Sequence, residues 1–453
     1  MNRRQRRGPL ARLIALPLAA SLIPGCLYTG TVNRPIAHAT PSYGYRPSNS
    51  DAFRARGGIT LYLAFSGGGT RAAALAYGVL AALRDTAVVI DGKRVRLIDE
   101  VDTVSGVSGG SFPATYYGLF GDRIFEEFEP RFLRRNIQGT LVSKILMPWN
   151  LIALMTPWLS RSDIAKTIYD KTVFDQATFD TLLQARGPRV YVNATDLSSG
   201  ERFVFNQGYF DVICSDLGSL PVASAVAASS AVPGLLSPVS LRNYAGACGF
   251  ELPEVMRDGL ATRRTDPRRY RAVAGFAGLG DSNKRYLHLI DGGISDNLGL
   301  RAALDTVSAA GGLVELAKLM SADIPPQLVI ISVNAETDPP SKLDLSAAAP
   351  SFAAVMNAVS GSQIRRYNFE TLVLVREAME LWAYEARRAG VDTAAHMVEV
   401  SFDNVEDEKE RRALKSIPTS FKLSDGDVDQ LIAAGRELLM ASPDFQELLR
   451  ALR

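Results

Sequence analysis

The sequence predicts an α/β fold in which helices cover both faces of a central parallel or mixed sheet. Short runs of β-forming apolar residues alternate with longer helical patterns along the chain. The runs are apolar at consecutive positions, as expected for strands buried on both faces. The 453 residues are 47% hydrophobic and 22% charged, which is ordinary for a globular protein with a sizeable core.

The first 26 residues are expected to be a signal peptide. The basic stretch "MNRRQRRG" precedes the apolar stretch "PLARLIALPLAASLIPG", which is too short and too interrupted by Arg12 and Pro17 to span a membrane. "LIPGC", which ends at Cys26, resembles the lipobox of bacterial lipoproteins, and that resemblance implies lipidation of Cys26. Leu27 follows it, which favours the outer membrane of a cell with two membranes. An unlipidated signal peptide, with a periplasmic or secreted protein, is the alternative.

The following segments divide the chain further. Residues 27–58 are rich in Pro, Gly, Ser and Asn and are expected to be a flexible tether. An α/β domain is expected over 59–341, and a mostly helical C-terminal extension over 342–453. The expected strands of the domain are 59–65, 100–106, 189–195, 285–291 and 327–335. The expected helices are 71–85, a second from about residue 111, and, in the extension, 364–390 and one that Ser424 caps.

Charge and cysteine content exclude little. A net charge of +2 does not suggest a nucleic-acid-binding protein. After the signal peptide only Cys214 and Cys248 remain, and both a disulfide and two free thiols are possible. Two cysteines and three histidines show no metal-ligand spacing, so we expect no metal and no cofactor. The sequence does not indicate an oligomeric state.

Ser108 is the candidate nucleophile. It lies in Gly106-Val107-Ser108-Gly109-Gly110, a G-x-S-x-G between an expected strand and an expected helix. Such a tight turn exposes the serine, and the flanking Gly106 and Gly110 remove side chains that would collide. An ordinary Gly/Ser loop is the alternative.

A glycine-rich loop is the candidate oxyanion site. Gly67, Gly68 and Gly69 follow the first strand and precede the first helix, so their N–H groups lie at the positive end of a helix dipole. These groups can stabilise the negative charge of a tetrahedral intermediate. The ending Gly-Lys-Ser/Thr of a phosphate-binding P-loop is absent. A dinucleotide-binding turn, with Ala72 as its last small residue, is the alternative.

Asp291 is the candidate base. It ends the strand 285–291, and Gly292 and Gly293 leave space around it. A turn-forming Asp-Gly is the alternative. None of the histidines, which are His38, His288 and His396, has a recognisable catalytic setting.

The motifs GGGTRA, GVSGG and DGG, in this order, resemble the patatin-like phospholipase family over about residues 59–300. The resemblance implies a patatin-like three-layer fold and a serine lipid acyl hydrolase without a histidine. It implies Ser108 as nucleophile, Asp291 as base and Gly67–Gly69 as backbone donors. Arg71 matches the basic residue usual in the glycine-rich motif. Ser229 and Ser230 lie in a stretch that accompanies these motifs, either near the dyad or in a core helix.

Two alternatives to this function remain. One is a non-catalytic lipid-binding lipoprotein of the same fold. The other is an α/β-hydrolase in which His396 completes a Ser-His-Asp triad.

The apolar segment 141–160 is the candidate membrane contact. It contains Trp149 and Trp158, and Pro148 excludes a transmembrane helix. Tryptophans prefer the lipid headgroup region, and Lys144 and Arg161 suit anionic lipid. The expected partners are therefore an acyl-ester lipid and a membrane surface. A broken helical pair that covers the core is the alternative.

Overall fold

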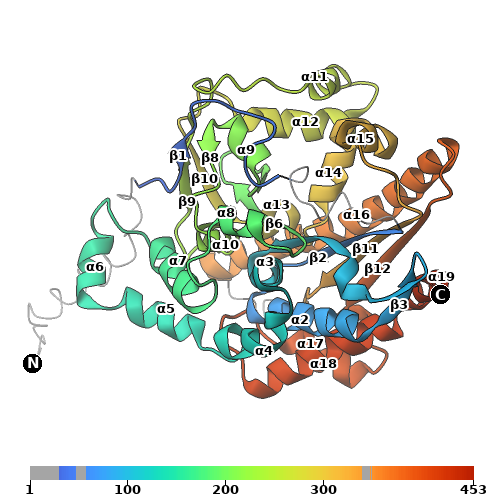
Figure 1. Ribbon diagram of the computed structural model, residues 1–453. Coiled ribbons are helices and arrows are strands. Elements are labelled where there is room, and N and C mark those ends of the chain that lie inside the picture. Colours follow the sequence, from blue (N-terminus) through green and yellow to red (C-terminus); the bar gives the residue numbers. More distant parts are fainter. Residues whose placement is uncertain (1–29, 47–57, 339–346, 348, 453) are drawn as a thin grey trace, which may run out of the picture.

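An eight-stranded mixed sheet forms the centre of the molecule (Figure 1). The computed structural model describes residues 30–46, 58–338, 347 and 349–452; the expected signal peptide, with Cys26, lies outside these ranges. The strand order is β12-β11-β2-β5-β6-β10-β9, and β7 pairs with β6. The strands are β2 (Ile59–Phe65), β5 (Val101–Val107), β6 (Arg189–Asp196), β7 (Arg202–Val204), β9 (Val239–Arg242), β10 (Tyr286–Asp291), β11 (Gln327–Asn334) and β12 (Ala394–Ser401).

Parallel pairing runs from β12 through β11, β2 and β5 to β6. Beyond β6 the pairing is antiparallel: β10 is antiparallel to both of its neighbours, β6 and β9. The sheet is therefore mixed, and the carboxyl ends of the parallel strands lie at one edge. The five expected strands of the domain correspond to β2, β5, β6, β10 and β11.

Side chains of β2 and β11 alternate between two hydrophobic clusters, as the period of a strand requires. On β2, Leu61, Leu63 and Phe65 belong to one cluster, and Tyr62 and Ala64 belong to the other. Helices on the first face include α2 (Gly69–Asp85), α3 (Ser111–Phe120), α10 (Val222–Ser229) and α18 (Asp425–Ala441). Helices on the second face include α14 (Arg301–Ala310) and α16 (Phe352–Arg388), and the short α13 (Gly293–Asp296) contacts α16. The fold thus has three layers.

Several further elements surround these layers. They are the hairpin β3 (Ala87–Ile90) and β4 (Lys93–Arg96), and the helices α4 (Ile124–Phe128), α5 (Ile137–Ile145), α6 (Pro148–Leu154), α7 (Arg161–Thr172), α8 (Phe179–Gln184), α9 (Gln207–Val212), α11 (Glu254–Ala261), α12 (Pro267–Leu279), α15 (Leu313–Met320), α17 (Glu408–Ser416) and α19 (Pro443–Ala451). Within the described ranges, no helix is both long and apolar enough to cross a bilayer.

The C-terminal region is built into the domain. Its strand β12 forms one edge of the central sheet, and α18, which Ser424 begins with a reciprocal capping box, packs against α2. Glycines allow this close approach, since a Cβ on Gly435 would overlap the Leu75 carbonyl and one on Gly78 would overlap the Ile432 carbonyl. The expected helical extension is mostly helical, but it also completes the sheet.

Residues 30–46 also belong to the fold, although a tether was expected there. The strand β1 (Arg34–Pro35) pairs with β8 (Ser215–Asp216). Tyr45 is buried, and its hydroxyl accepts a hydrogen bond from the Val190 N–H at 2.6 Å. Because this stretch supplies buried side chains and strand pairing, the N-terminal part of the expected tether is a structural element.

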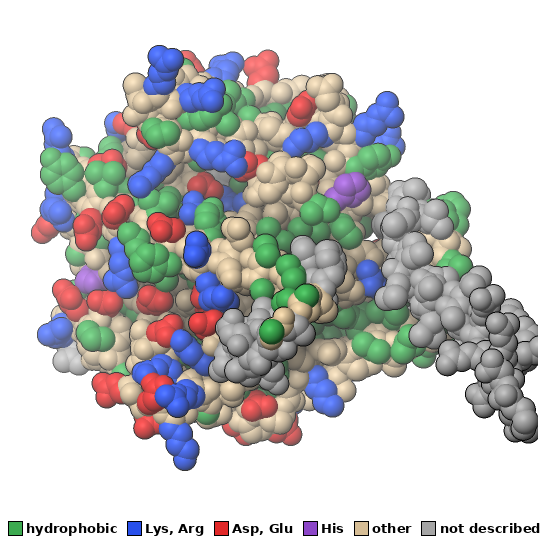
Figure 2. Space-filling view, turned by 180° about the vertical axis from the view of Figure 1, so that it is seen from behind, with side chains coloured by type: hydrophobic (Ala, Val, Ile, Leu, Met, Phe, Trp, Pro, Cys, Tyr) green, Lys and Arg blue, Asp and Glu red, His purple; other side chains and the backbone are tan. Residues whose placement is uncertain are grey.

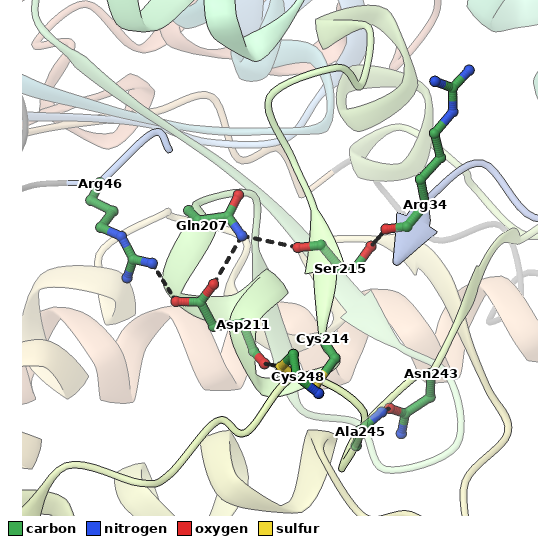
Figure 3. Close-up of a disulfide and its surroundings, with 9 residues drawn as sticks. All are labelled: Arg34, Arg46, Gln207, Asp211, Cys214, Ser215, Asn243, Ala245 and Cys248. Carbon is green, nitrogen blue, oxygen red and sulfur yellow. Dashed lines mark hydrogen bonds and ion pairs between the residues drawn. A yellow bond between two sulfur atoms is a disulfide. The ribbon is translucent and has the colours of Figure 1, made fainter. Parts of the chain in front are cut away.

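A disulfide joins Cys214 to Cys248 beside this segment (Figure 3). It closes a loop between the end of α9 and the region after β9. Asp211 forms an ion pair with Arg46 and accepts from Gln207 Nε2 at 2.9 Å. The cross-link and these polar contacts together hold residues 30–46 on the domain.

Candidate active site

Ser108 lies on a sharp turn between β5 and α3. Its φ of 49° is in the left-handed region, which is unusual for a residue with a side chain. A Cβ on Gly106 would lie 2.6 Å from the Ser111 Cα, and one on Gly110 would lie 2.5 Å from the Phe65 carbonyl oxygen. The two glycines of the motif are therefore required by close backbone packing, as the G-x-S-x-G pattern predicts.

The register of the sheet brings Asp291 to Ser108. Val107, which precedes the serine, pairs with Asn193 on β6. The next β6 residue, Ala194, pairs with Asp291 on β10. The Ser108 Oγ consequently donates a hydrogen bond to the Asp291 Oδ2 at 2.7 Å.

Asp291 is almost fully buried, which raises the pKa of its carboxyl group to about 6. The Gly293 N–H, which donates to the Asp291 Oδ1 at 2.8 Å, and the Ser108 hydroxyl partly offset this effect. A Cβ on Gly292 would overlap the Asn193 carbonyl, so only glycine fits directly after Asp291. The carboxyl group is thus held in place and is a stronger base than an exposed aspartate.

Ser229, at the end of α10, connects the two loops that carry Ser108 and Asp291. Its Oγ accepts from the Ser108 N–H at 2.8 Å, and its carbonyl accepts from the Gly292 N–H at 3.2 Å. The Ser230 hydroxyl instead bonds to the Val226 carbonyl within the helix. Of the two serines considered, Ser229 therefore contacts the site.

The glycine-rich loop lies beside Ser108 at the start of α2. A Cβ on Gly67 would be 3.4 Å from the Ser108 Cβ, and one on Gly109 would be 2.5 Å from the Gly69 nitrogen. Gly68 and Gly69 have φ values of 142° and 61°, which favour glycine. Only glycines allow the loop to approach the serine this closely.

The N–H groups of this loop differ in availability. The Gly67 N–H donates to the Asn297 carbonyl at 3.0 Å. No described residue accepts from the Gly68 or Gly69 N–H, and Gly69 is the first residue of α2. Gly67 was expected to donate to the oxyanion, but its N–H is already bonded to Asn297, so it supports the loop instead. The N–H groups of Gly68 and Gly69 remain available as oxyanion donors. The sequence carries no signal for the part played by Asn297.

Arg71 connects this loop to the C-terminal region. Its buried guanidinium donates to the Ala335 carbonyl at 3.0 Å and to the Ile417 carbonyl at 2.6 Å. Burial lowers the pKa of Arg71 to about 10. The Thr70 N–H donates to the Ser420 carbonyl at 2.8 Å. Residues 417–420 thus support the glycine-rich loop from behind.

No histidine contacts Ser108 or Asp291. His38 is exposed, and the Nδ1 of His288 lies 2.9 Å from the Ser240 Oγ. His396 lies on the edge strand β12, separated from β5 by β11 and β2, and its Nε2 is 2.9 Å from the Gln327 Oε1. The geometry therefore provides no Ser-His-Asp triad.

The arrangement can support acyl transfer. A serine hydroxyl contacts a carboxylate of raised pKa, and beside it, at a helix N-terminus, lie two N–H groups that have no acceptor in the described part of the chain. These are the nucleophile, base and oxyanion donors that acyl transfer needs. Among the described residues, no group of three or more His, Cys, Asp or Glu side chains is placed to hold a metal ion.

Comparison with known proteins identifies the family. Residues 63–304 match the model of the patatin-like phospholipases, and the chain belongs to this family. No protein of curated function matches the chain.

Two solved structures resemble the chain at low similarity. Human GIVD cytosolic phospholipase A2 is 12% identical, with a TM-score of 0.43, over 89% of this chain and 63% of that one. VipD from Legionella pneumophila is 12% identical, with a TM-score of 0.28, over 90% of this chain and 71% of that one. The chain thus spans less than two thirds of the phospholipase's length.

Proposed function

We propose that this protein is a lipid acyl hydrolase that uses Ser108 and Asp291 as a catalytic dyad. The hydrogen bond of 2.7 Å between the Ser108 Oγ and the Asp291 Oδ2 is the observation that carries the proposal. Membership of the patatin-like phospholipase family supports a lipid ester as the substrate. Intact Ser108 and Asp291 favour an enzyme over a lipid-binding protein, which needs neither.

In the first half of the reaction, the Ser108 Oγ attacks the ester carbonyl carbon while its proton moves to Asp291. The tetrahedral intermediate carries its negative charge on the former carbonyl oxygen, beside the Gly68 and Gly69 N–H groups. Removal of one such donor typically costs about 3 to 4 kcal/mol of transition-state stabilisation. The ester C–O bond then breaks, and the leaving oxygen takes the proton from Asp291.

In the second half, water hydrolyses the acyl-serine. Asp291 accepts a proton from the water as its oxygen attacks the acyl carbon, and returns the proton to Ser108 as the fatty acid leaves. A pKa of about 6 makes Asp291 ionised at neutral pH and able to act as a base in both steps.

Substrate reaches the dyad, in this proposal, from a membrane surface. Large apolar side chains of α5, α6 and the following loop are exposed, and they are Leu146, Trp149, Ile152, Met155 and Trp158. Figure 1 shows α6 projecting from the side of the molecule. The segment is a broken helical pair, and its outer side chains form an apolar surface that suits an interfacial position.

A short loop and two hydrogen bonds connect the start of α7, next to this apolar surface, with Asp291. Arg161, at the start of α7, donates to the Gly234 carbonyl at 2.9 Å. The loop of Gly234 includes the exposed Val232, which follows Ala231, and the Ala231 carbonyl accepts from the Asp291 N–H. Lys144 is exposed on α5 and complements anionic headgroups. A bilayer bound here would bring lipid close to Ser108.

We also propose export and lipid anchoring through Cys26. The N-terminal sequence supports this, and so does the disulfide between Cys214 and Cys248, because such cross-links persist in oxidising compartments. Replacement of Cys26 by Ser should release the protein from membranes into the soluble fraction. A variant that still fractionates wholly with membranes would contradict the anchor.

The hydrolase proposal is tested by incubating the purified protein with mixed phospholipids and analysing the products by mass spectrometry. Wild type should release fatty acids and lysophospholipids, and a folded Ser108→Ala variant should release neither. Equal release by both proteins would overturn the proposal.

A further inference from the structure

A cavity of about 350 Å³ lies apart from Ser108, between α12, α14, α16 and the loop before β7. Its volume falls within the range of small-molecule sites. Ser295 forms part of its wall, and the Ser295 Oγ lies 2.8 Å from the Thr195 Oγ1, which donates to the Asp291 carbonyl at 2.9 Å. The cavity is therefore separate from the dyad but lies close behind it.

Arginines dominate the charged lining of this cavity, and most of them are paired. Four arginines and two carboxylates line it, and these residues are Arg202, Arg268, Arg271, Arg301, Glu201 and Asp305. Arg202 pairs with Asp305, Arg271 with Glu201, and Arg268 with Glu377. Figure 2 shows Lys and Arg side chains over the upper part of the molecule, where α11 and α12 lie. Among the arginines of the lining, Arg301 is the one whose guanidinium forms no ion pair with a described carboxylate.

Arg202 and Arg301 form the inner part of the cavity. The side chain of Arg202 is 8% exposed, and it pairs with Asp305 at 2.7 Å. Its buried Nε–H has no hydrogen-bond partner among the described residues. Its Nη2 lies 3.4 Å from the Arg301 carbonyl, so the two arginines are neighbours. The Arg202 guanidinium is thus fixed mainly by its ion pair with Asp305.

Arg301 is held in a fixed plane but lacks an ion pair. Its guanidinium stacks on the Tyr367 ring at 4.1 Å, and its Nε donates to the Thr371 Oγ1 at 3.1 Å. The Arg301 backbone N–H donates to the Asp296 Oδ2 at 2.8 Å, but among the described residues no carboxylate lies within 4 Å of the guanidinium nitrogens. A planar, positioned guanidinium suits the oxygens of a phosphate group.

We propose that this cavity binds a phosphate-bearing small molecule through Arg301, Arg202 and Arg271. Arg271, at the mouth, is 70% exposed, and its ion pair with Glu201 can be exchanged for a phosphate contact. The phosphate can belong to a water-soluble ester or to a lipid headgroup. Figure 1 shows α12 and α14 in the upper part of the molecule and α6 at its left side. Binding of a phosphate here requires neither the proposed membrane contact nor the proposed hydrolase activity.

Calorimetric titration of the full chain with glycerol 3-phosphate tests the proposal, since the readout does not involve turnover. We expect saturable binding at one site per chain, weakened about tenfold or more by Arg301→Gln and also by Arg271→Gln. Arg412→Gln, an exposed arginine on α17, should bind as wild type does and is the matched control. Thermal melts establish that each variant is folded. Because Arg271 is exposed, Arg271→Gln tests the site without disturbing the packing of the core.

Vesicles that contain phosphatidic acid distinguish the two sources of phosphate. If glycerol 3-phosphate binds and the vesicles do not compete, the ligand is a soluble ester. If Arg301-dependent binding occurs only to the vesicles, the site recognises a lipid headgroup. Absence of binding to both probes, or binding that neither Arg301→Gln nor Arg271→Gln weakens, would overturn the proposal.

Discussion

The Ser108 hydroxyl donates directly to the Asp291 carboxylate at 2.7 Å, and no histidine contacts either residue. Burial raises the pKa of Asp291 to about 6, so the residue that receives the proton is ionised only above that pH. In the proposed mechanism the ionised form is the base, and the protonated form is inactive.

We therefore expect kcat/KM for a soluble ester to rise with pH and to level off above about pH 6, because this parameter reports the free enzyme. The measurement is a pH–rate profile with a substrate that does not titrate between pH 4 and 8. A profile that is flat through this range, or that falls as pH rises through 6, would contradict Asp291 as the base.

Replacement of Arg71 by Met should have a larger effect on the kcat of the protein than on its thermal stability. The change removes hydrogen bonds to the Ala335 and Ile417 carbonyls, and so loosens the loop that carries Gly68 and Gly69. We expect kcat to fall at least about tenfold, as for partial loss of one oxyanion donor. Kinetics and a thermal melt measure the two effects, and Arg84→Met, on the exposed end of α2, is the control. Full activity in a folded Arg71→Met variant would show that the loop does not depend on this residue.

Removal of the disulfide should destabilise the fold. Cys214 and Cys248 close a loop of 34 residues, and such cross-links typically contribute about 2 to 4 kcal/mol. Denaturant unfolding of the Cys214→Ala, Cys248→Ala double variant measures the loss. Among the described residues, neither cysteine forms a hydrogen bond with Ser108 or Asp291, so the folded variant should retain esterase activity. Unchanged stability would mean that the cross-link adds nothing to the folded state.

The double variant Trp149→Ala, Trp158→Ala should bind anionic vesicles at least about tenfold more weakly, since each tryptophan loses apolar area that would enter the headgroup region. Hydrolysis of a short-chain soluble ester should be unchanged. Vesicle sedimentation measures the partitioning, preferably with Cys26→Ser to remove any lipid anchor. Equal partitioning of both proteins would exclude this surface as the membrane contact.

Much of the fold could be predicted because its signals are local. The apolar runs at 59–65 and 327–335 need burial on both faces, and the glycines around Ser108 and Asp291 permit turns that other residues do not. Long-range pairing could not be predicted. The antiparallel pairing of β10 with β6, which places Asp291 opposite Ala194, depends on the arrangement of the whole sheet.

The other differences between the expected and the observed structure also arise from contacts between distant segments of the chain. Residues 30–46 look like a linker by composition, but their pairing with β8 is a tertiary contact. The Gly67 N–H is occupied by Asn297, and Ser229 binds the Ser108 N–H, through contacts between distant segments. No periodicity or motif in the sequence reports such contacts.

Covalent labelling of Ser108 by a fluorophosphonate probe tests the dyad most directly, because it requires an activated serine but no particular lipid. Wild type should be labelled on the peptide that contains Ser108, and Ser108→Ala should not be labelled. Asp291→Asn should react at least about 100-fold more slowly, the usual contribution of a general base. His38→Ala, His288→Gln and His396→Gln should react as wild type does. A folded His396→Gln or His288→Gln variant that labels as slowly as Asp291→Asn, or an Asp291→Asn variant that labels at the wild-type rate, would contradict the Ser108–Asp291 dyad.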